Sequence, residues 1–165
     1  MISHHSQGKK MKLGFCNLAP RYLYIGKGGW YHWDHDLQQP ILIKQKGLRG
    51  YLKAIDLKEQ TFKGKTSLKL LIYLSTDDED FVIKSGLNSW FSKTILLRLR
   101  SLEINQLSQP ITIGVQSGQD ENVLFGVIRP SVKLPEGFDY SRLDESQLID
   151  LATLVNNRIK QSTNN

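Results

Sequence analysis

The chain has 165 residues, with 22 lysine and arginine residues against 16 aspartate and glutamate residues, a formal net charge of +6. This length predicts one domain, and the single cysteine, Cys16, excludes an intramolecular disulfide framework and a cysteine-rich zinc ribbon. No apolar run approaches the ~20 residues that span a bilayer. The polar residues 1–12 also lack the apolar segment of a secretory signal, so we expect a soluble, cytoplasmic protein without membrane contact.

The N-terminal part predicts an arm followed by a β extension. Residues 1–10 are polar after Ile2 and are expected to form a flexible arm. Residues 22–33 place aromatic and β-branched side chains on both sides of the turn formed by Gly26, Lys27, Gly28 and Gly29, which is typical of a hairpin. Pro40 ends a short loop, and residues 41–43 are the next expected strand.

Three strands are expected between residues 48 and 85. Residues 48–57 alternate, with Leu48, Gly50, Leu52 and Ala54 predicted inward and Arg49, Tyr51, Lys53 and Ile55 predicted outward. A loop is expected over 58–65. Residues 67–74 predict a second strand, with Lys69, Leu71 and Tyr73 facing outward, and an acidic turn over 76–80 leads to a third strand at 81–85.

The hydrophobic period then changes. Trp90, Phe91, Ile95, Leu96 and Leu99 recur at three- and four-residue spacing, so residues 87–102 predict an amphipathic helix capped by Ser89 or Asn88. Strands at 111–116 and 123–128 follow, joined by a polar turn. Residues 140–155 repeat the helical spacing and predict a C-terminal helix capped by Asp144 or Ser141.

The resulting order over residues 48–129 is strand, strand, strand, helix, strand, strand. This order resembles that of the OB-fold single-stranded nucleic-acid-binding proteins, in which a helix lies between the third and fourth strands of a five-stranded, partly open Greek-key barrel. The predicted fold class is therefore all-β with minor α. We expect an arm at 1–10, an OB-like barrel domain with an N-terminal β-hairpin extension at 11–135, and a helical tail at 136–165.

The charge is concentrated in the first part of the chain. Residues 1–75 hold 13 lysine and arginine residues against 4 aspartate and glutamate residues, a charge of +9, whereas residues 76–165 hold 9 against 12, a charge of −3. This asymmetry favours contact with a polyanion. The alternative is that lysine-rich strands are simply solvated and protected from edge-to-edge pairing.

No enzyme, metal or cofactor pattern is found. His32 and His35 lie three residues apart, so a strand would point them to opposite faces. The turn at Gly26–Gly29 lacks the spacing of a phosphate loop, and Cys16 has no neighbouring base. We therefore expect no catalytic residue, no metal and no cofactor.

Aromatic and basic residues instead predict binding of single-stranded DNA without enzymatic activity. A cationic groove neutralises phosphates, and aromatic faces stack bases with little regard to sequence. By resemblance, the outer face of the second and third barrel strands, together with the first loop, is where a nucleic-acid strand would lie. The expected binding residues are Lys27, Trp30, Tyr31, Trp33, Arg49, Tyr51, Lys53, Lys63, Lys65, Lys69 and Tyr73. RNA as the ligand, a protein-interaction module and a homo-oligomer stay open as alternatives.

Overall fold

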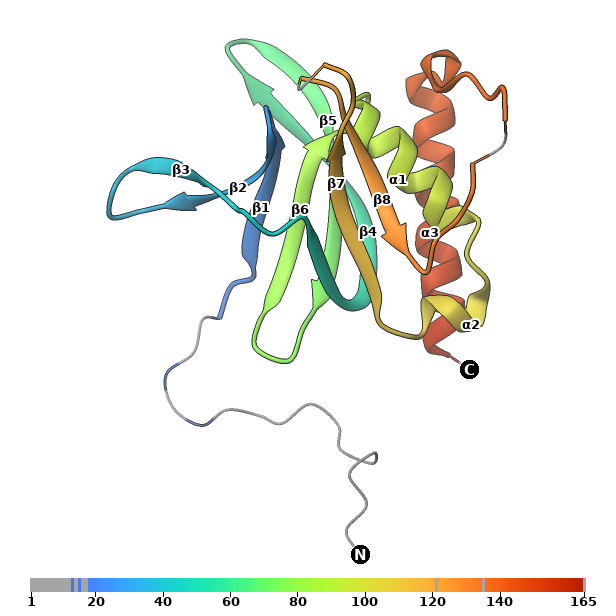
Figure 1. Ribbon diagram of the computed structural model, residues 1–165, viewed down its shortest axis with the longest axis horizontal. Coiled ribbons are helices and arrows are strands. Elements are labelled where there is room, and N and C mark those ends of the chain that lie inside the picture. Colours follow the sequence, from blue (N-terminus) through green and yellow to red (C-terminus); the bar gives the residue numbers. More distant parts are fainter. Residues whose placement is uncertain (1–12, 14, 16–17, 121, 135, 165) are drawn as a thin grey trace, which may run out of the picture.

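The computed structural model describes residues 13, 15, 18–120, 122–134 and 136–164. The arm expected at 1–10 and Cys16 lie outside this described part. The strands are β1 (Arg21–Gly26), β2 (Gly29–Asp34), β3 (Gln39–Leu42), β4 (Gly47–Phe62), β5 (Lys65–Ser75), β6 (Asp80–Gly86), β7 (Ile111–Ser117) and β8 (Leu124–Arg129). The helices are α1 (Trp90–Arg100), α2 (Ile104–Leu107), the short 3-10 helix η1 (Tyr140–Arg142) and α3 (Glu145–Thr163) (Figure 1).

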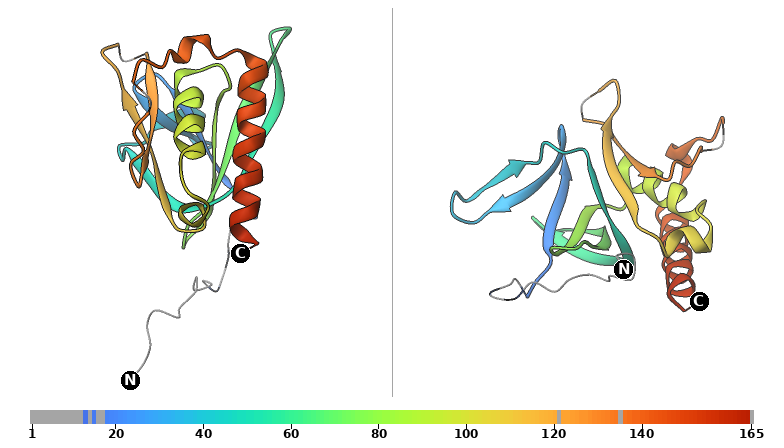
Figure 2. Two further views of the ribbon diagram at one scale, coloured as in Figure 1. Left: turned by 90° about the vertical axis from the view of Figure 1, so that its right-hand side faces the viewer. Right: turned by 60° about the horizontal axis from the view of Figure 1, so that its bottom comes forward.

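These strands form one curled, mixed sheet. The strand order is β3-β2-β1-β6-β5-β4-β7-β8, in which β1 pairs in parallel with β6 and every other neighbouring pair is antiparallel. Because β1 pairs with the edge of β6, β6 and β8 do not meet and the sheet stays open (Figure 1 and Figure 2). The prediction of a mainly β protein with an inserted and a C-terminal helix is confirmed, but its five-stranded barrel is wrong: the five strands belong to an eight-stranded half-barrel.

The long strand β4 changes partners along its length, and this change curls the sheet. Its first residues pair with β7, whereas Tyr51 onward pairs with β5. A bulge lies between Leu52 and Ala54, and a bulge bends its strand and increases the local twist. The backbone N–H of Ile55 donates to the side-chain oxygen of Asn156 in α3, 3.0 Å away, so the C-terminal helix satisfies a donor just after the bulge.

The bulge also corrects two predictions for β4. It shifts the alternation by one residue, so Ile55, predicted outward, is buried in the core, and Ala54 takes the outward position opposite Tyr73. The loop expected over 58–65 is absent, because β4 continues to Phe62. Lys63 and Gly64 form a two-residue turn with φ values of 50° and 77°, as the tightest hairpins require.

The main core lies between one face of the sheet and the helices. Helix α1 packs against β8, and α3 packs against β4 and α1. This core includes Leu23, Trp30, Leu52, Ile55, Leu70, Ile72, Leu74, Ile83, Phe91, Ile95, Leu99, Ile111, Ile113, Leu148, Val155 and Ile159. Its members on β5 are Leu70, Ile72 and Leu74, which alternate with Lys69, Leu71 and Tyr73, the residues predicted outward.

Both long helices confirm their predicted caps. The side-chain oxygen of Ser89 accepts from the N–H of Ser92, 3.2 Å away, at the start of α1. Asp144 and Gln147 form a reciprocal capping box at the start of α3. Helix α3 runs to Thr163, beyond the expected end at residue 155, because Ile159 continues its buried stripe. No helix in the described part of the chain is long and apolar enough to cross a membrane.

Candidate nucleic-acid interface

A second layer of side chains covers the sheet on the side away from the helices; we call this side the outer face. Paired residues on neighbouring strands point to the same side of a sheet, so the pairing assigns its members in three rows. The rows are Ala54, Tyr73, Val82 and Tyr22; Asp56, Leu71, Lys84, Tyr24 and Tyr31; and Lys58, Lys69 and Gly86. Leu71 and Val82 are buried but do not belong to the helix-packed core, so the surrounding tyrosines and lysines cover them.

Tyrosines dominate the β1 side of the outer face. The rings of Tyr22 and Tyr24 lie with centroids 6.2 Å apart and planes inclined by 20°. These residues are 37% and 41% exposed, so each presents ring surface to solvent. Tyr24 is paired with Tyr31, whose hydroxyl donates to the carbonyl oxygen of Lys27 in the β1–β2 turn. Base stacking needs accessible ring faces of this kind.

Three lysines lie together on β4, β5 and β6; we call Lys58, Lys69 and Lys84 the lysine cluster. Lys58 and Lys69 are direct cross-strand partners, and Lys84 is paired with Leu71, two residues along β5 from Lys69. Burial, followed by the charges of Lys58 and Lys69, lowers the pKa of Lys84. No ion pair joins any of the three to a described carboxylate. Like charges placed opposite one another destabilise a sheet, so this cluster is a site of uncompensated positive charge.

Lys84 connects the cluster to the tyrosines. Its ammonium nitrogen lies 5.9 Å from the centroid of the Tyr24 ring, a cation–π distance. In the neighbouring row, burial raises the pKa of the Tyr73 hydroxyl, with smaller contributions from Tyr22 and Asp56. Asp56 is the carboxylate in the row that contains Lys84 and Tyr24, and it accepts from the backbone N–H of Leu57, 2.8 Å away.

The first half of β4 adds Arg49, Tyr51 and Lys53, which were predicted to share a face. Tyr51 is exposed, and the Lys53 ammonium lies 5.6 Å from its ring centroid. Arg49 is exposed as well, but its Nε donates to the Thr112 hydroxyl on β7, 3.0 Å away. These residues therefore extend the outer face toward β7.

The predicted residues of the first loop lie at the tip of the β4–β5 hairpin instead. Lys63 is in the turn, where its ammonium lies 5.4 Å from the Phe62 ring. Lys65 is the cross-strand partner of Phe62 and is exposed. Because a tight turn replaces the loop, Lys63 and Lys65 lie at the end of the hairpin. The cross-strand pair Gln60 and Ser67 separates them from the lysine cluster.

Trp30 corrects the predicted aromatic set. It is 1% exposed, belongs to the helix-side core, and its Nε1–H donates to the Gln45 carbonyl oxygen 2.7 Å away. A buried ring cannot stack on a base without unfolding, so Trp30 is structural. Trp33 is 42% exposed and pairs with Pro40, so alternation along β2 separates the two tryptophans.

An open cavity of about 700 Å³ lies where β2 diverges from β1. Its aromatic lining is Tyr22, Tyr24 and Trp33, and its polar lining includes His32 and Asp34. This volume is within the range of about 300–1,000 Å³ for small-ligand sites. The cavity adjoins the row that contains Lys84, so it extends the outer face past β1.

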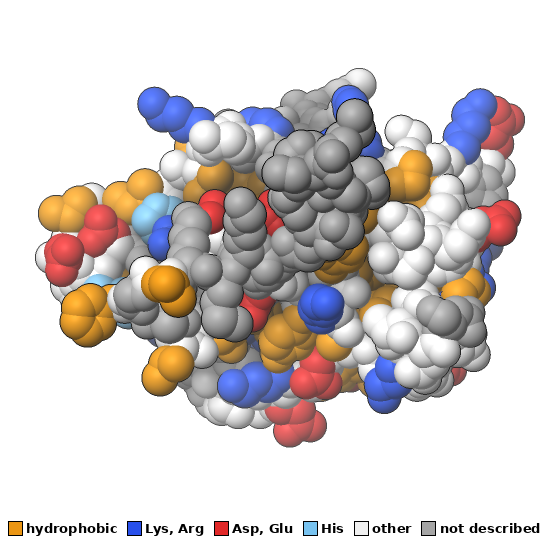
Figure 3. Space-filling model, turned by 90° about the horizontal axis from the view of Figure 1, so that it is seen from below, with side chains coloured by type: hydrophobic (Ala, Val, Ile, Leu, Met, Phe, Trp, Pro, Cys, Tyr) orange, Lys and Arg blue, Asp and Glu red, His pale blue; other side chains and the backbone are white. Residues whose placement is uncertain are grey.

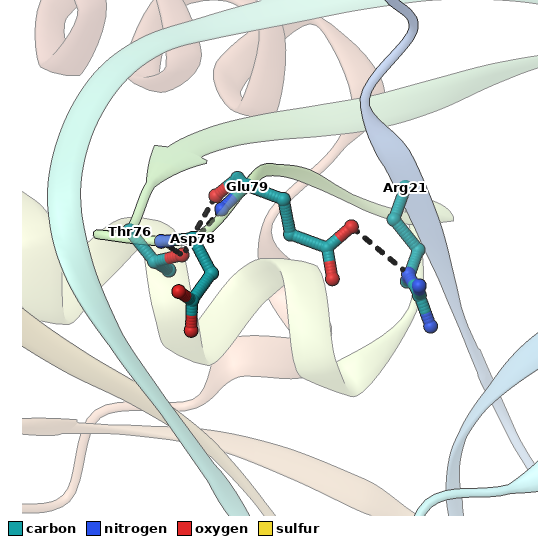
Figure 4. A network of polar contacts seen from close by, with 4 residues as sticks. All are labelled: Arg21, Thr76, Asp78 and Glu79. Carbon is teal, nitrogen blue, oxygen red and sulfur yellow. Dashed lines mark hydrogen bonds and ion pairs between the residues drawn. The ribbon is translucent and has the colours of Figure 1, made fainter. Parts of the chain in front are cut away.

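The β5–β6 turn gives one end of the outer face a different charge. The Thr76 hydroxyl accepts from the N–H groups of Asp78 and Glu79, at 3.3 and 3.1 Å, and donates to the Glu79 carbonyl oxygen at 2.7 Å (Figure 4). The Glu79 carboxylate pairs with Arg21 at 3.2 Å. Seen from below, side chains of both signs are interspersed (Figure 3). The Glu79–Arg21 pair therefore gives this end of the outer face charges of both signs, unlike the lysine cluster.

Sequence reasoning missed Tyr22 and Lys84 as site residues, and it expected Lys58 in the first loop rather than on a strand. The position of Lys84 on the outer face could have been predicted from the sequence, because Val82 and Lys84 alternate with the inward Ile83. No sequence pattern could have placed Tyr22 there, since it joins the outer face only through the parallel pairing of β1 with β6. Among the described residues, no group of three or more histidine, cysteine, aspartate or glutamate side chains is arranged to hold a metal ion.

Comparison with protein-family models, with curated proteins and with solved structures gave no match for this chain. What the outer face does must be inferred from its chemistry.

Proposed function

We propose that this chain is a non-enzymatic single-stranded DNA-binding protein that holds the strand on its outer face, largely without regard to sequence. The observation that carries the proposal is the lysine cluster, three ammonium groups without a carboxylate partner beside exposed tyrosine rings. Such a cluster costs stability in the free protein, and a polyanion removes that cost. The resemblance of β4, β5, β6, α1, β7 and β8 to the OB-fold strand order also supports it, although β1 occupies the β6 edge.

The chemistry of the outer face favours an unpaired strand. Tyrosine rings gain stacking energy from the flat surface of a base, which is hidden inside a duplex. Lysine is a point charge that binds phosphate without the bidentate geometry that reads base edges. Because neither side chain distinguishes the four bases strongly, we expect weak sequence preference.

The charge of the outer face sets the expected salt dependence. Four positively charged side chains of the outer face are counted, those of Lys53, Lys58, Lys69 and Lys84. If each neutralises one phosphate of a single strand, the slope of log affinity against log salt is about −3. Affinity should then fall about fiftyfold between about 50 and 200 mM salt.

Fluorescence anisotropy with a labelled oligothymidylate of about 20 nucleotides tests the proposal. We expect binding at low salt, the slope above, and weaker binding of a duplex of equal length. No binding at about 50 mM salt would refute the proposal. Tighter binding of the matching oligouridylate would make RNA the ligand.

A protein-interaction module is a second candidate, favoured by the β2–β3 hairpin. Leu37 and Leu42 are exposed on this hairpin, which projects from the sheet (Figure 1), and β3 is an edge strand that can pair with another chain. Light scattering over a concentration series detects a homo-oligomer. A stable oligomer that ignores oligonucleotides would favour this candidate over DNA binding.

A further inference from the structure

Gly86 leaves an open place on the outer face, at the end of β6. A methyl group added at Gly86 would meet no atom within 4 Å. The backbone around it is nevertheless held in place, because the Gly86 carbonyl oxygen accepts from the Ser92 hydroxyl at 2.6 Å and from the Ser89 N–H at 3.0 Å. The position is thus a rigid gap in the side-chain layer.

The lysine cluster lies beside this gap. Lys69 is the direct cross-strand partner of Gly86, and Lys58 is the partner of Lys69 on the far side. Lys84 lies two residues before Gly86 on the same strand and face, which places their Cα atoms about 6.6 Å apart. Each lysine has a flexible four-carbon stem, so all three ammonium groups can reach the space above the glycine.

We propose that the space above Gly86 binds one phosphate group of the DNA backbone, held by Lys58, Lys69 and Lys84. The inference rests on the proposed function and names the position at which the strand is held. A side chain at residue 86 would occupy this space. The bare backbone leaves room for a tetrahedral anion between three cations.

The nearest acidic group on the outer face does not fill this role. Asp56 is the cross-strand partner of Leu71, one row away from the Lys58–Lys69 pair, and its carboxylate accepts from the Leu57 N–H. Among the described residues no carboxylate forms an ion pair with Lys58, Lys69 or Lys84, and a phosphate above Gly86 would supply that partner.

The position of Lys84 also gives the direction of the strand. Its ammonium lies 5.9 Å from the centroid of the Tyr24 ring, and its backbone lies two residues before Gly86 on β6. A nucleotide whose phosphate lies above Gly86 can stack its base, or the next one, on Tyr24. The strand thus crosses the sheet from β5 toward β1, and its continuation enters the cavity beside Trp33.

A carboxylate introduced at Gly86 tests the phosphate site. Gly86→Glu puts a negative charge in the open space, Gly86→Ala keeps the charge unchanged, and Asn157→Glu adds the same charge to an exposed position of α3 on the other side of the sheet. The measurement is oligothymidylate anisotropy over a salt series. Circular dichroism shows whether each variant is folded.

We expect Gly86→Glu to weaken binding at least about tenfold and to reduce the salt slope by about 0.7 or more, the contribution of one phosphate on a single strand. Asn157→Glu should stay within about twofold of the parent, whereas Gly86→Ala, whose methyl group enters the same space without a charge, should weaken binding less than Gly86→Glu does. If Gly86→Glu binds like Asn157→Glu while the parent binds well, the phosphate site is refuted and the proposed function stands. A parent that does not bind refutes both.

If Gly86→Glu does not fold, two lysine substitutions that each remove one positive charge test the phosphate site instead. Lys69→Gln removes a cation beside Gly86, and Lys160→Gln removes one from an exposed position of α3. The inference requires a loss of about 0.7 in salt slope for Lys69→Gln alone. Equal slopes for the two variants would overturn it.

Discussion

Replacing Trp30 with phenylalanine separates the structural tryptophan of β2 from the exposed one. Trp30 is 1% exposed, and its Nε1–H donates to the Gln45 carbonyl oxygen at 2.7 Å. Trp30→Phe removes this donor, leaves the carbonyl short of a partner at a cost of about 1–3 kcal/mol, and leaves a void where the larger ring packed. We expect a total loss of about 2–3 kcal/mol in the free energy of unfolding.

Trp33→Phe is the matched control. Trp33 is 42% exposed on the same strand, so its replacement should change the free energy of unfolding by no more than about 0.5 kcal/mol. For a chain of this size, the loss at Trp30 corresponds to a fall of roughly 5–10 °C in the melting temperature.

Urea unfolding followed by far-ultraviolet circular dichroism measures both variants, and oligothymidylate binding is measured well below the unfolding midpoint. We expect Trp30→Phe to bind within about twofold of the parent, because the buried ring does not touch the outer face. Equal stability of the two variants, or a loss of binding by a fully folded Trp30→Phe, would refute the assignment of Trp30 to the core.

Three further outcomes are expected. Tyr24→Ala should weaken oligonucleotide binding by about 1–3 kcal/mol, whereas Tyr24→Phe keeps the stacking ring and should bind nearly normally in the same anisotropy assay. Burial, with the other two lysines of the cluster, lowers the pKa of Lys84, so affinity should fall as pH rises through that pKa. Over the same interval the free energy of unfolding should rise, because the unfolded chain holds the proton to higher pH. Lys84→Gln should flatten both pH curves. Gly126→Ala should cost about 1–3 kcal/mol in urea unfolding, because the added methyl would lie 2.7 Å from Cβ of Ile95, while Gly86→Ala, with open space around it, should cost little.

Local patterns in the sequence were sufficient for much of the scaffold. The alternation of Leu70, Ile72 and Leu74 with Lys69 and Tyr73 depends on the two-residue period of a strand, so it survives any choice of partner strand. The same holds for α1 and α3, whose apolar spacing and Ser89 and Asp144 caps are local features. These patterns placed Lys69 and Tyr73 on the outer face before any tertiary contact was known.

The local patterns did not predict the bulge in β4 or the tight turn between β4 and β5. The bulge beside Lys53 shifted the alternation and moved Ile55 inward, and it lies within the pairing of β4 with β5, just after the residues that pair with β7. The turn at Lys63 and Gly64 replaced a loop expected to be eight residues long because Phe62 pairs directly with Lys65. Neither the bulge nor the tight turn follows from the regular two-residue alternation by which a strand is predicted.

The sequence by itself determined which residues alternate, where the long helices begin, and that the positive charge lies in the first part of the chain. Only the tertiary structure decided which of these residues meet. The parallel pairing of β1 with β6 left the barrel open and brought Tyr22 and Tyr24 beside Lys84, and it placed Trp30 in the core. The reason is physical: period and capping are interactions within a few residues, whereas strand partners are chosen by the burial and hydrogen bonding of the whole sheet.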